Sequence, residues 1–195
     1  MAWALSTSPA DICIISSWES DLPANSDNHK VPSVLTYDSR GIVSSWGYKL
    51  EPHRHHISWF KLLLSEQATN MVARHQPDRL RKLQKLLLEY DKRPVDVAAD
   101  YLRCLWQHTS KELSRRVPGL WEVADLKIIL TVPAIWELSA QELTKEAAKM
   151  AGLLDRENTA LELVGEPEAA ALSVFDEMTS QNWRKLKVGK LRLSI

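Results

Sequence analysis

A stretch late in the chain, residues 127–175, most restricts the fold because it alternates between two hydrophobic periodicities. Residues 127–131 are β-branched or apolar, apart from the lysine that opens them, and predict a buried strand. Residues 160–164 form a second apolar run, which Glu166 and Pro167 end, and proline suits the first turn of a helix that continues to residue 175. Strand–helix–strand segments of this length predict a right-handed crossover and a parallel pair. Glu166 is therefore expected at the carboxyl end of a strand, where open α/β sheets bind ligands.

The segment between these two strands has the pattern of a capped amphipathic helix. Ser139 lies three residues before Glu142, the spacing of a capping box. Gly152 is expected to end the helix in a left-handed conformation. The inward face is predicted to carry four apolar residues at helical spacing: Leu143, Ala147, Met150 and Leu154.

The first two thirds of the chain predict short strands followed by helices. The expected strands are Ala2–Leu5 and Asp11–Ser16, forming a hairpin around residues 7–9, and two edge strands, Val34–Tyr37 and Ser45–Lys49. Polar stretches predict loops at Glu19–His29 and His53–His56. Helices are expected to start at Trp59–Glu66, to place Leu80, Leu83, Leu87 and Tyr90 on one face, and to run from Pro94 to Val117 with Val97, Tyr101 and Leu105 inward.

Three short motifs in the late stretch occur in an order and spacing that resemble a known family. They are Thr131-Val132-Pro133-Ala134, Ala147-x-x-x-Ala-Gly152 and Glu166-Pro167-x-Ala-Ala-Ala171. Together they resemble the ATPase domain of the 70-kDa heat-shock protein family, and a divergent branch of it more than the chaperones proper. Lys30–Ser33 and the stretch 94–106 are similar to that branch as well. The resemblance implies an α/β chain with a partial actin-like, ribonuclease H-like ATPase fold, in which helices flank a mixed sheet.

The resemblance extends from residue 1 to residue 189, and residues 190–195 diverge from it. It implies that residues 1–189 form the first lobe only of such a domain, truncated at both ends. The family's two glycine-rich phosphate loops are not recognisable: none of the six glycines has a glycine neighbour, and neither GxGxxG nor GxxxxGK[ST] is present. Glycine permits the close approach of backbone N–H groups to phosphate oxygens. A truncated gene model, an alternative transcript and a pseudogene product would each account for this pattern.

Three residues match positions that carry the family's nucleotide chemistry. The resemblance implies that Glu166 lies near Mg²⁺ and the water that attacks the γ-phosphate, and holds metal-bound waters without binding the metal directly. It implies that Lys61 reaches the γ-phosphate and that Pro133 transmits the nucleotide state to a neighbouring domain. Each residue also has a purely structural interpretation. Glu166 could cap a helix, Lys61 could be a solvated side chain and Pro133 could end a strand.

Other conspicuous residues favour structural roles. Adjacent histidines in His53–His56 do not fix a coordination geometry, so a solvated loop is favoured over a metal site. Cys13 and Cys104 lie far apart without a CxxC motif and are expected to be buried, reduced thiols. Three of the eight tryptophans lie within apolar runs and are expected in the core: Trp3, Trp106 and Trp136.

Composition and resemblance together leave two main hypotheses for function. Lys and Arg number 25, as do Asp and Glu, and no apolar run reaches the about 18–20 residues that cross a bilayer, so neither a nucleic-acid nor a membrane partner is expected. One hypothesis is an ATP- and Mg²⁺-dependent, chaperone-like cytoplasmic ATPase with protein clients or cochaperones, this chain being inactive alone. The alternative is a non-catalytic interaction module that does not bind ATP. An actin-like sugar kinase fits the motifs less well.

Overall fold

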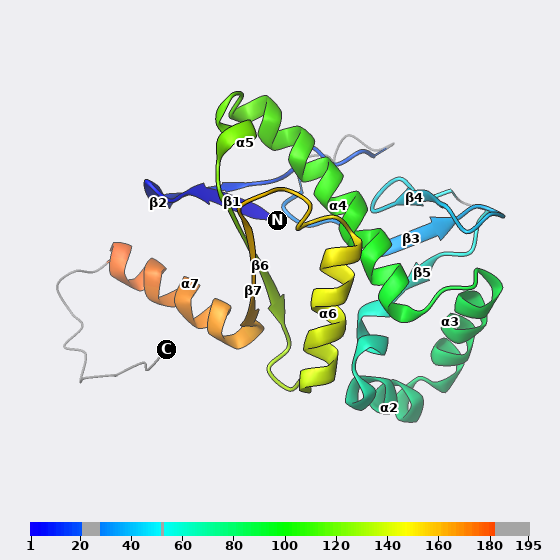
Figure 1. Ribbon diagram of the computed structural model, residues 1–195. Helices are drawn as coiled ribbons and strands as arrows, with labels where there is room; N and C mark the ends of the chain where they lie inside the picture. The colour runs from blue at the N-terminus through cyan, green and yellow to red at the C-terminus, as the bar shows by residue number, and fades with distance from the viewer. Residues whose placement is uncertain (21–27, 52, 182–195) are drawn as a thin grey trace, which may run out of the picture.

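A strand–helix–strand unit lies in the carboxyl-terminal half of the molecule. The computed structural model describes residues 1–20, 28–51 and 53–181. Strand β6 (Leu126–Val132), helix α6 (Leu138–Met150) and strand β7 (Thr159–Gly165) form the unit (Figure 1). The two strands pair in parallel, in a register that runs from Leu126 opposite Thr159 to Val132 opposite Gly165. The predicted strands, the helix between them and their parallel pairing are therefore confirmed.

Helix α6 begins differently from the prediction. Its N-cap is Glu137, which makes no side-chain capping bond, so the predicted capping box is wrong. Because the helix starts at Leu138, Ser139 lies inside the first turn, and Glu142 instead accepts a hydrogen bond from Lys145 at 2.8 Å. Gly152 ends the helix with a φ of 81°, a left-handed backbone conformation that glycine adopts without strain.

The buried face of α6 consists of small side chains. Leu143 and Leu154 are half-buried, whereas Met150 is exposed and its predicted inward position is wrong. Close approach of α6 to its neighbours is possible because alanine has no side chain beyond Cβ. The buried residues on and just after this face are Ala140, Ala147, Ala148, Ala151 and Leu153.

Helix α4 (Pro94–Arg116) packs against α6 and is the longest helix in the described part of the chain. Its first turn is closed by Asp96, which accepts a hydrogen bond from the backbone N–H of Arg93 at 2.8 Å. The Arg93 side chain also bonds this carboxylate and lowers the pKa of Asp96. Val97 and Tyr101 are buried and Leu105 is half-buried, so the predicted inward face is confirmed.

A buried polar cluster joins α4 to the amino-terminal half. The carboxylate of Asp100 accepts hydrogen bonds from the Tyr37 hydroxyl at 3.0 Å, from Lys92 Nζ at 3.0 Å and from Arg103 Nη1 at 2.5 Å. Arg103 also donates to the backbone oxygen of Met150, the last residue of α6, at 2.8 Å. Burial, and then the charge of Asp100, raises the pKa of Tyr37, which favours the protonated phenol that donates to Asp100.

The strands of the amino-terminal half form two further small sheets. Strands β1 (Ala2–Leu5) and β2 (Ser8–Ile14) make the predicted antiparallel hairpin, with a shorter turn than expected. Strand β3 (Val34–Tyr37) lies between β4 (Val43–Trp46) and β5 (Ile57–Ser58). The prediction that β3 is an edge strand is therefore wrong: all four of its residues are buried. Of the predicted loop at Glu19–His29, residues 21–27 lie outside the described part.

The sequence predicted that one helix starts at Trp59–Glu66, but two separate helices follow β5 in this region. A 3₁₀-helix, η1 (Phe60–Leu64), is separated from α2 (Glu66–His75) by Ser65, whose extended backbone breaks the helix. The predicted amphipathic helix is α3 (Pro77–Glu89), and Leu80, Leu83 and Leu87 are buried on it. A short helix, α5 (Leu120–Val123), precedes β6.

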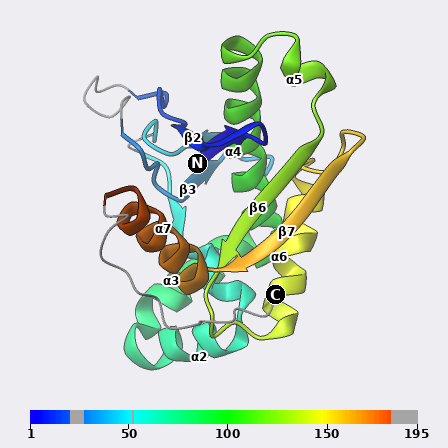
Figure 2. The ribbon, with the colours of Figure 1, turned by 90° about the vertical axis from the view of Figure 1, so that its left-hand side faces the viewer.

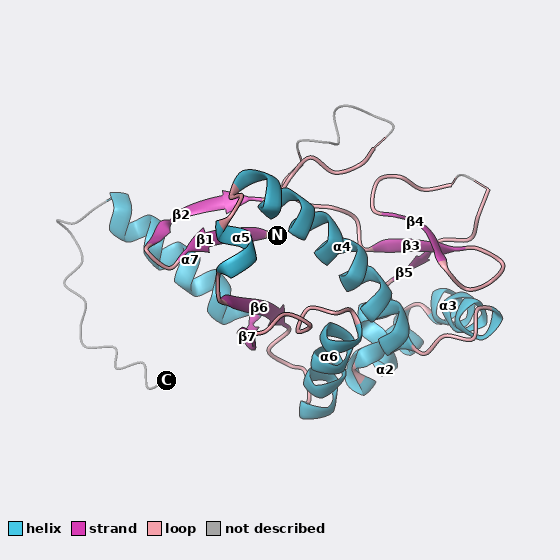
Figure 3. Ribbon diagram, turned by 45° about the horizontal axis from the view of Figure 1, so that its top comes forward, coloured by secondary structure: helices cyan, strands magenta, loops and turns pink. Residues whose placement is uncertain are grey.

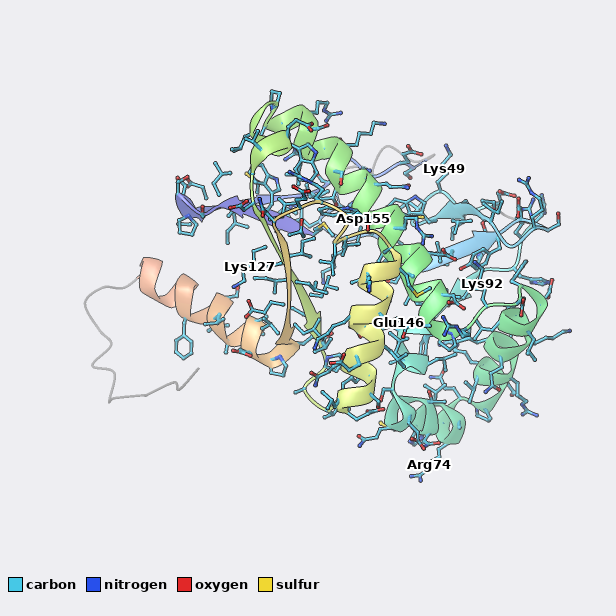
Figure 4. All side chains as sticks on the ribbon, in the orientation of Figure 1. Lys49, Arg74, Lys92, Lys127, Glu146 and Asp155 are labelled. Carbon is cyan, nitrogen blue, oxygen red and sulfur yellow. The ribbon has the colours of Figure 1, made fainter. Side chains whose placement is uncertain are left out.

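The last described helix, α7 (Glu166–Gln181), starts directly after β7, as predicted. Helices α6 and α7 lie on opposite sides of the β6–β7 pair (Figure 3). The side toward α6 is packed, whereas the other side exposes Ile129 and a salt bridge between Lys127 and Glu162. Lys127 projects away from α6 (Figure 4). Each strand of the pair is therefore covered well on one face only.

This mixed arrangement of helices and small sheets is compatible with the expected fold class. Within residues 1–20, 28–51 and 53–181, the strands form three separate sheets, two antiparallel and one parallel. No helix in these residues is long and apolar enough to cross a bilayer. The predicted divergent tail, residues 190–195, lies outside the described residues.

Candidate functional site

Glu166 occupies the position that the strand pattern predicts. It is the first residue of α7 and follows Gly165, the last residue of β7. Figure 2 shows that β6 and β7 end together next to the start of α7. A carboxylate there is favoured by the partial positive charge of the helix N-terminus. Its side chain is 45% exposed, so it is available to a ligand or to solvent.

Lys61 reaches this same carboxylate from a different part of the chain. Its Nζ donates to Glu166 Oε1 at 2.7 Å across a separation of 105 residues. The ammonium also lies 5.5 Å from the centre of the Trp136 ring, a favourable cation–π position. Lys61 is 47% exposed, and an ion pair this accessible stabilises the fold by only about 0.2–1 kcal/mol. The pair is therefore easily exchanged for contacts with a ligand.

Pro133 lies at the end of the neighbouring strand and opens a tight turn. It follows Val132, which pairs with Gly165, and its carbonyl oxygen accepts a hydrogen bond from the N–H of Trp136 at 3.1 Å. This turn buries Trp136 beneath Lys61. The structure thus brings the three sequence-predicted residues to one end of the β6–β7 pair, with Lys61 and Glu166 in direct contact.

A small cleft lies behind the Lys61–Glu166 pair. Its volume is about 160 Å³, and its walls come from η1, α4, β6 and α6. Aromatic and aliphatic side chains dominate the lining, which also includes Ser33, Thr131 and Thr144. The cleft is smaller than the about 300–1,000 Å³ of ordinary small-molecule sites. It accommodates a small group adjacent to Lys61 rather than a whole nucleotide.

The remaining candidates lie elsewhere. The four residues His53–His56 are exposed in a loop, and Arg54 pairs with Glu51 and donates to the Tyr37 carbonyl oxygen at 3.1 Å. Among the described residues, no three His, Cys, Asp or Glu side chains converge as metal ligands would. Cys13 and Cys104 are both free and half-buried, and burial raises the pKa of the Cys104 thiol to about 11.

The tryptophans divide differently from the prediction. Trp136 is buried, whereas Trp3 and Trp106 are half-buried. Trp18, which no apolar run marks, is almost fully buried and stacks on His108 with ring centres 4.6 Å apart. It lines a second cavity of about 440 Å³, which lies along β4 and the turn after it. That cavity shares no lining residue with the cleft behind Lys61.

Sequence reasoning missed one pair of residues that shapes the site. Ser65 is the N-cap of α2, and its hydroxyl donates to Glu137 Oε2 at 2.9 Å. The N–H of Glu66 donates to the other oxygen of Glu137 at 2.6 Å. A serine just before a helical run signals an N-cap. No local pattern indicates that Glu137, which lies 72 residues away, completes it.

Comparison with known proteins supports the family resemblance. The chain is 30% identical over 183 residues to Heat shock 70 kDa protein 12B of Homo sapiens, and the match covers 88% of the chain. This similarity supports an Hsp70-like relationship. The chain spans about a quarter of the length of this relative, 25%. No protein-family model matches the chain, and no solved structure matches it either.

Proposed function

We propose that the chain forms part of an Hsp70-like nucleotide-binding, ATPase-type unit, in which Lys61 and Glu166 lie at the phosphate end of the bound nucleotide. The observation that supports this proposal is the 2.7 Å contact between the two side chains at the carboxyl ends of β6 and β7. Parallel α/β units place ligands at that end. The similarity to a 70-kDa heat-shock protein supports the nucleotide as the ligand.

The two side chains suit the two halves of a magnesium–phosphate group. A carboxylate accepts hydrogen bonds from metal-bound waters, and a compact ammonium group contacts a phosphate oxygen. Bound Mg²⁺ supplies neutralisation of phosphate charge. In the absence of nucleotide, Glu166 neutralises Lys61, and on binding the ammonium turns from the carboxylate to the phosphate. Both groups are half exposed and need little rearrangement.

The wider proposal follows the family resemblance. Residues 1–189 belong to the first lobe of an actin-like domain, and Pro133 transmits the nucleotide state from the end of β6. The intact unit acts in the cytoplasm on protein clients, with or without cochaperones. The turn that Pro133 opens contacts the site through Trp136, which is consistent with such a role.

We expect the 195-residue chain alone to show no saturable MgATP binding. None of its six glycines has a glycine neighbour, so no glycine-rich hairpin offers several N–H donors to the phosphates. Isothermal titration calorimetry at nucleotide concentrations from micromolar to millimolar checks this. A saturable isotherm that disappears in Glu166→Ala would contradict the expectation and would assign binding to this chain by itself.

In a protein that supplies phosphate loops, Lys61 and Glu166 are expected to control hydrolysis. We expect Lys61→Ala and Glu166→Ala each to lower kcat at least about tenfold in a chimera in which this chain replaces the matching segment of an active Hsp70-like ATPase, because each removes charge stabilisation at the reacting phosphate. Lys127→Ala and Glu162→Ala are the matched controls, since they break a salt bridge on the exposed side of the same strands. Equal loss in both pairs of variants would refute the assignment.

A second candidate function is a non-catalytic interaction module. It is favoured by apolar side chains that are exposed on β6 and α7, among them Ile129, Leu172 and Val174. Large exposed apolar patches mark sites of protein association. The chimera separates the two candidates: a folded chimera that neither binds nor hydrolyses ATP supports the interaction module, whereas hydrolysis that depends on Lys61 and Glu166 supports the nucleotide unit.

A further inference from the structure

Glu137 makes contacts that its own helix does not need. It is the N-cap residue of α6, yet its carboxylate points to a different helix and contacts Ser65 and Glu66 at the start of α2. Ser65 is almost fully buried, and its hydroxyl oxygen also accepts a hydrogen bond from the N–H of Ala68 at 3.1 Å. The serine therefore uses both its donor and its acceptor capacity. The carboxylate occupies the positive end of α2, where negative charge is favoured.

These contacts close a ring around the candidate site. Glu166 follows Gly165, which pairs with Val132 at the end of β6. The turn from Pro133 leads from Val132 to Glu137, and Glu137 holds the junction between η1 and α2. Lys61 lies on η1 and returns to Glu166 at 2.7 Å. Each link is a hydrogen bond, a strand pairing or a short stretch of chain, so a change at one link alters the geometry at the next.

We propose that Glu137 is a positioning residue that ties the β6–α6 loop to the η1–α2 junction and thereby holds Lys61 against Glu166. The 3₁₀-helix that carries Lys61 is only five residues long, and such helices are weakly stable by themselves. Its buried residues, Phe60 and Leu64, fix its inner face but do not fix how far its exposed edge extends toward β7. The two hydrogen bonds of Glu137 fix the residues that directly follow η1.

The charge of Glu137 is consistent with this arrangement. Its own backbone N–H, and then the Ser65 hydroxyl and the N–H groups of Glu66 and Gln67, lower the pKa of Glu137. Because the pKa is lowered in the folded state, the contribution of Glu137 is present above the ordinary glutamate pKa and is lost as the pH falls through the lowered value. At neutral pH Glu137 is therefore ionised, and its contacts with Ser65 and Glu66 contribute in full.

The test measures Lys61 directly, without nucleotide. In the full chain, a water-soluble amine-acylating reagent labels lysines, and peptide mass spectrometry follows the rate at each of them. Glu137→Ala is expected to raise the labelling rate of Lys61 by up to about fivefold, as Glu166→Ala does, because an exposed ion pair protects by no more than that. The double variant is expected to show no further increase, since both substitutions release the same lysine.

Two controls separate positioning from general loosening. Glu142→Ala removes a carboxylate from the same end of α6, but one that bonds only Lys145 in the described structure, and is expected to leave Lys61 unchanged. Lys127, which pairs with Glu162, is the internal reference in every variant and is expected to keep its rate. A rise at Lys127 equal to that at Lys61 would show general loosening and would overturn the proposal.

The result that decides against positioning is a folded Glu137→Ala protein in which Lys61 is labelled at the unsubstituted rate. If Glu137→Ala does not fold by circular dichroism, Glu137→Gln decides by the same criterion, because the amide keeps the size and one acceptor but loses the charge. The role of Glu137 in positioning a nucleotide-site lysine rests on the proposed function, whereas its effect on the labelling rate of Lys61 does not. A folded chimera that neither binds nor hydrolyses ATP would refute the function and leave the contact of Glu137 established, while an unchanged Lys61 would refute only the positioning by Glu137.

Discussion

Trp136→Ala is expected to lower the free energy of unfolding by about 3–5 kcal/mol, the usual range for removing a buried tryptophan side chain. The indole is 5% exposed and packs in the main core cluster beside α6 and η1. It also forms one wall of the small cleft behind Lys61, so its removal enlarges an existing cavity that the neighbouring backbone cannot easily fill. Chemical denaturation followed by circular dichroism measures the change.

Trp59→Ala is the matched control for this substitution. Trp59 lies just before η1, is 39% exposed, and has the guanidinium of Arg79 4.1 Å from its ring centre. Loss of an exposed cation–π contact is expected to cost about 0.5–1 kcal/mol. A Trp136→Ala protein that is destabilised no more than Trp59→Ala would contradict the position of Trp136 in the core, and with it the support beneath Lys61.

The strand–helix–strand unit was predictable because each of its boundaries is encoded by adjacent residues. Apolar runs define β6 and β7, Gly152 takes the positive φ that ends α6, and Pro167 lies in the first turn of α7. A connection that contains a whole helix is typical of parallel pairing between the two strands, and the crossover is then right-handed. The position of Glu166 at the end of β7 follows from the same local signals.

Contacts between distant segments were not predictable in this way. The capping box at Ser139 was wrong because a serine and a glutamate at the right spacing do not determine where a helix starts. The N-cap is Glu137, two residues before Ser139, and its carboxylate accepts hydrogen bonds from the start of α2. Strand β3 was predicted at an edge, yet it is central, because strand order depends on which partners pack on it and not on its own four residues.

The candidate site combines both kinds of information. Lys61 lies in a run of apolar residues that gives no indication of its partner, and only the family resemblance pointed to it. The contact with Glu166 depends on the packing of η1 against α4, which brings Lys61 to the end of β7. Lys61 and Glu166 are 105 residues apart in the sequence. The roles of Lys61, Glu166 and Pro133 remain proposals, whereas their proximity is a property of the fold.

Asp100→Ala is expected to lower the free energy of unfolding by about 3 kcal/mol. Asp100 is 8% exposed and accepts hydrogen bonds from Tyr37, Lys92 and Arg103. Its removal leaves the buried Tyr37 hydroxyl without an acceptor, which costs about 1–3 kcal/mol. It also leaves the Lys92 and Arg103 cations without this acceptor. The cost stays at the lower end of the range for breaking buried ion pairs, since Lys92 and Arg103 retain contact with solvent. Urea denaturation measures it.

A double-mutant cycle shows whether the loss of stability in Asp100→Ala comes from the unpaired Tyr37 hydroxyl. Tyr37→Phe removes the donor itself, so the double variant with Asp100→Ala is expected to be destabilised by less than the sum of the single changes. Asp78→Ala serves as the surface control, because its side chain is 93% exposed and pairs only with Arg81 in the described residues; its effect should stay within about 0.5 kcal/mol. Strict additivity of the buried pair would show that Asp100 acts through its cations alone. The hydroxyl of Tyr37 would then contribute nothing to joining β3 and α4.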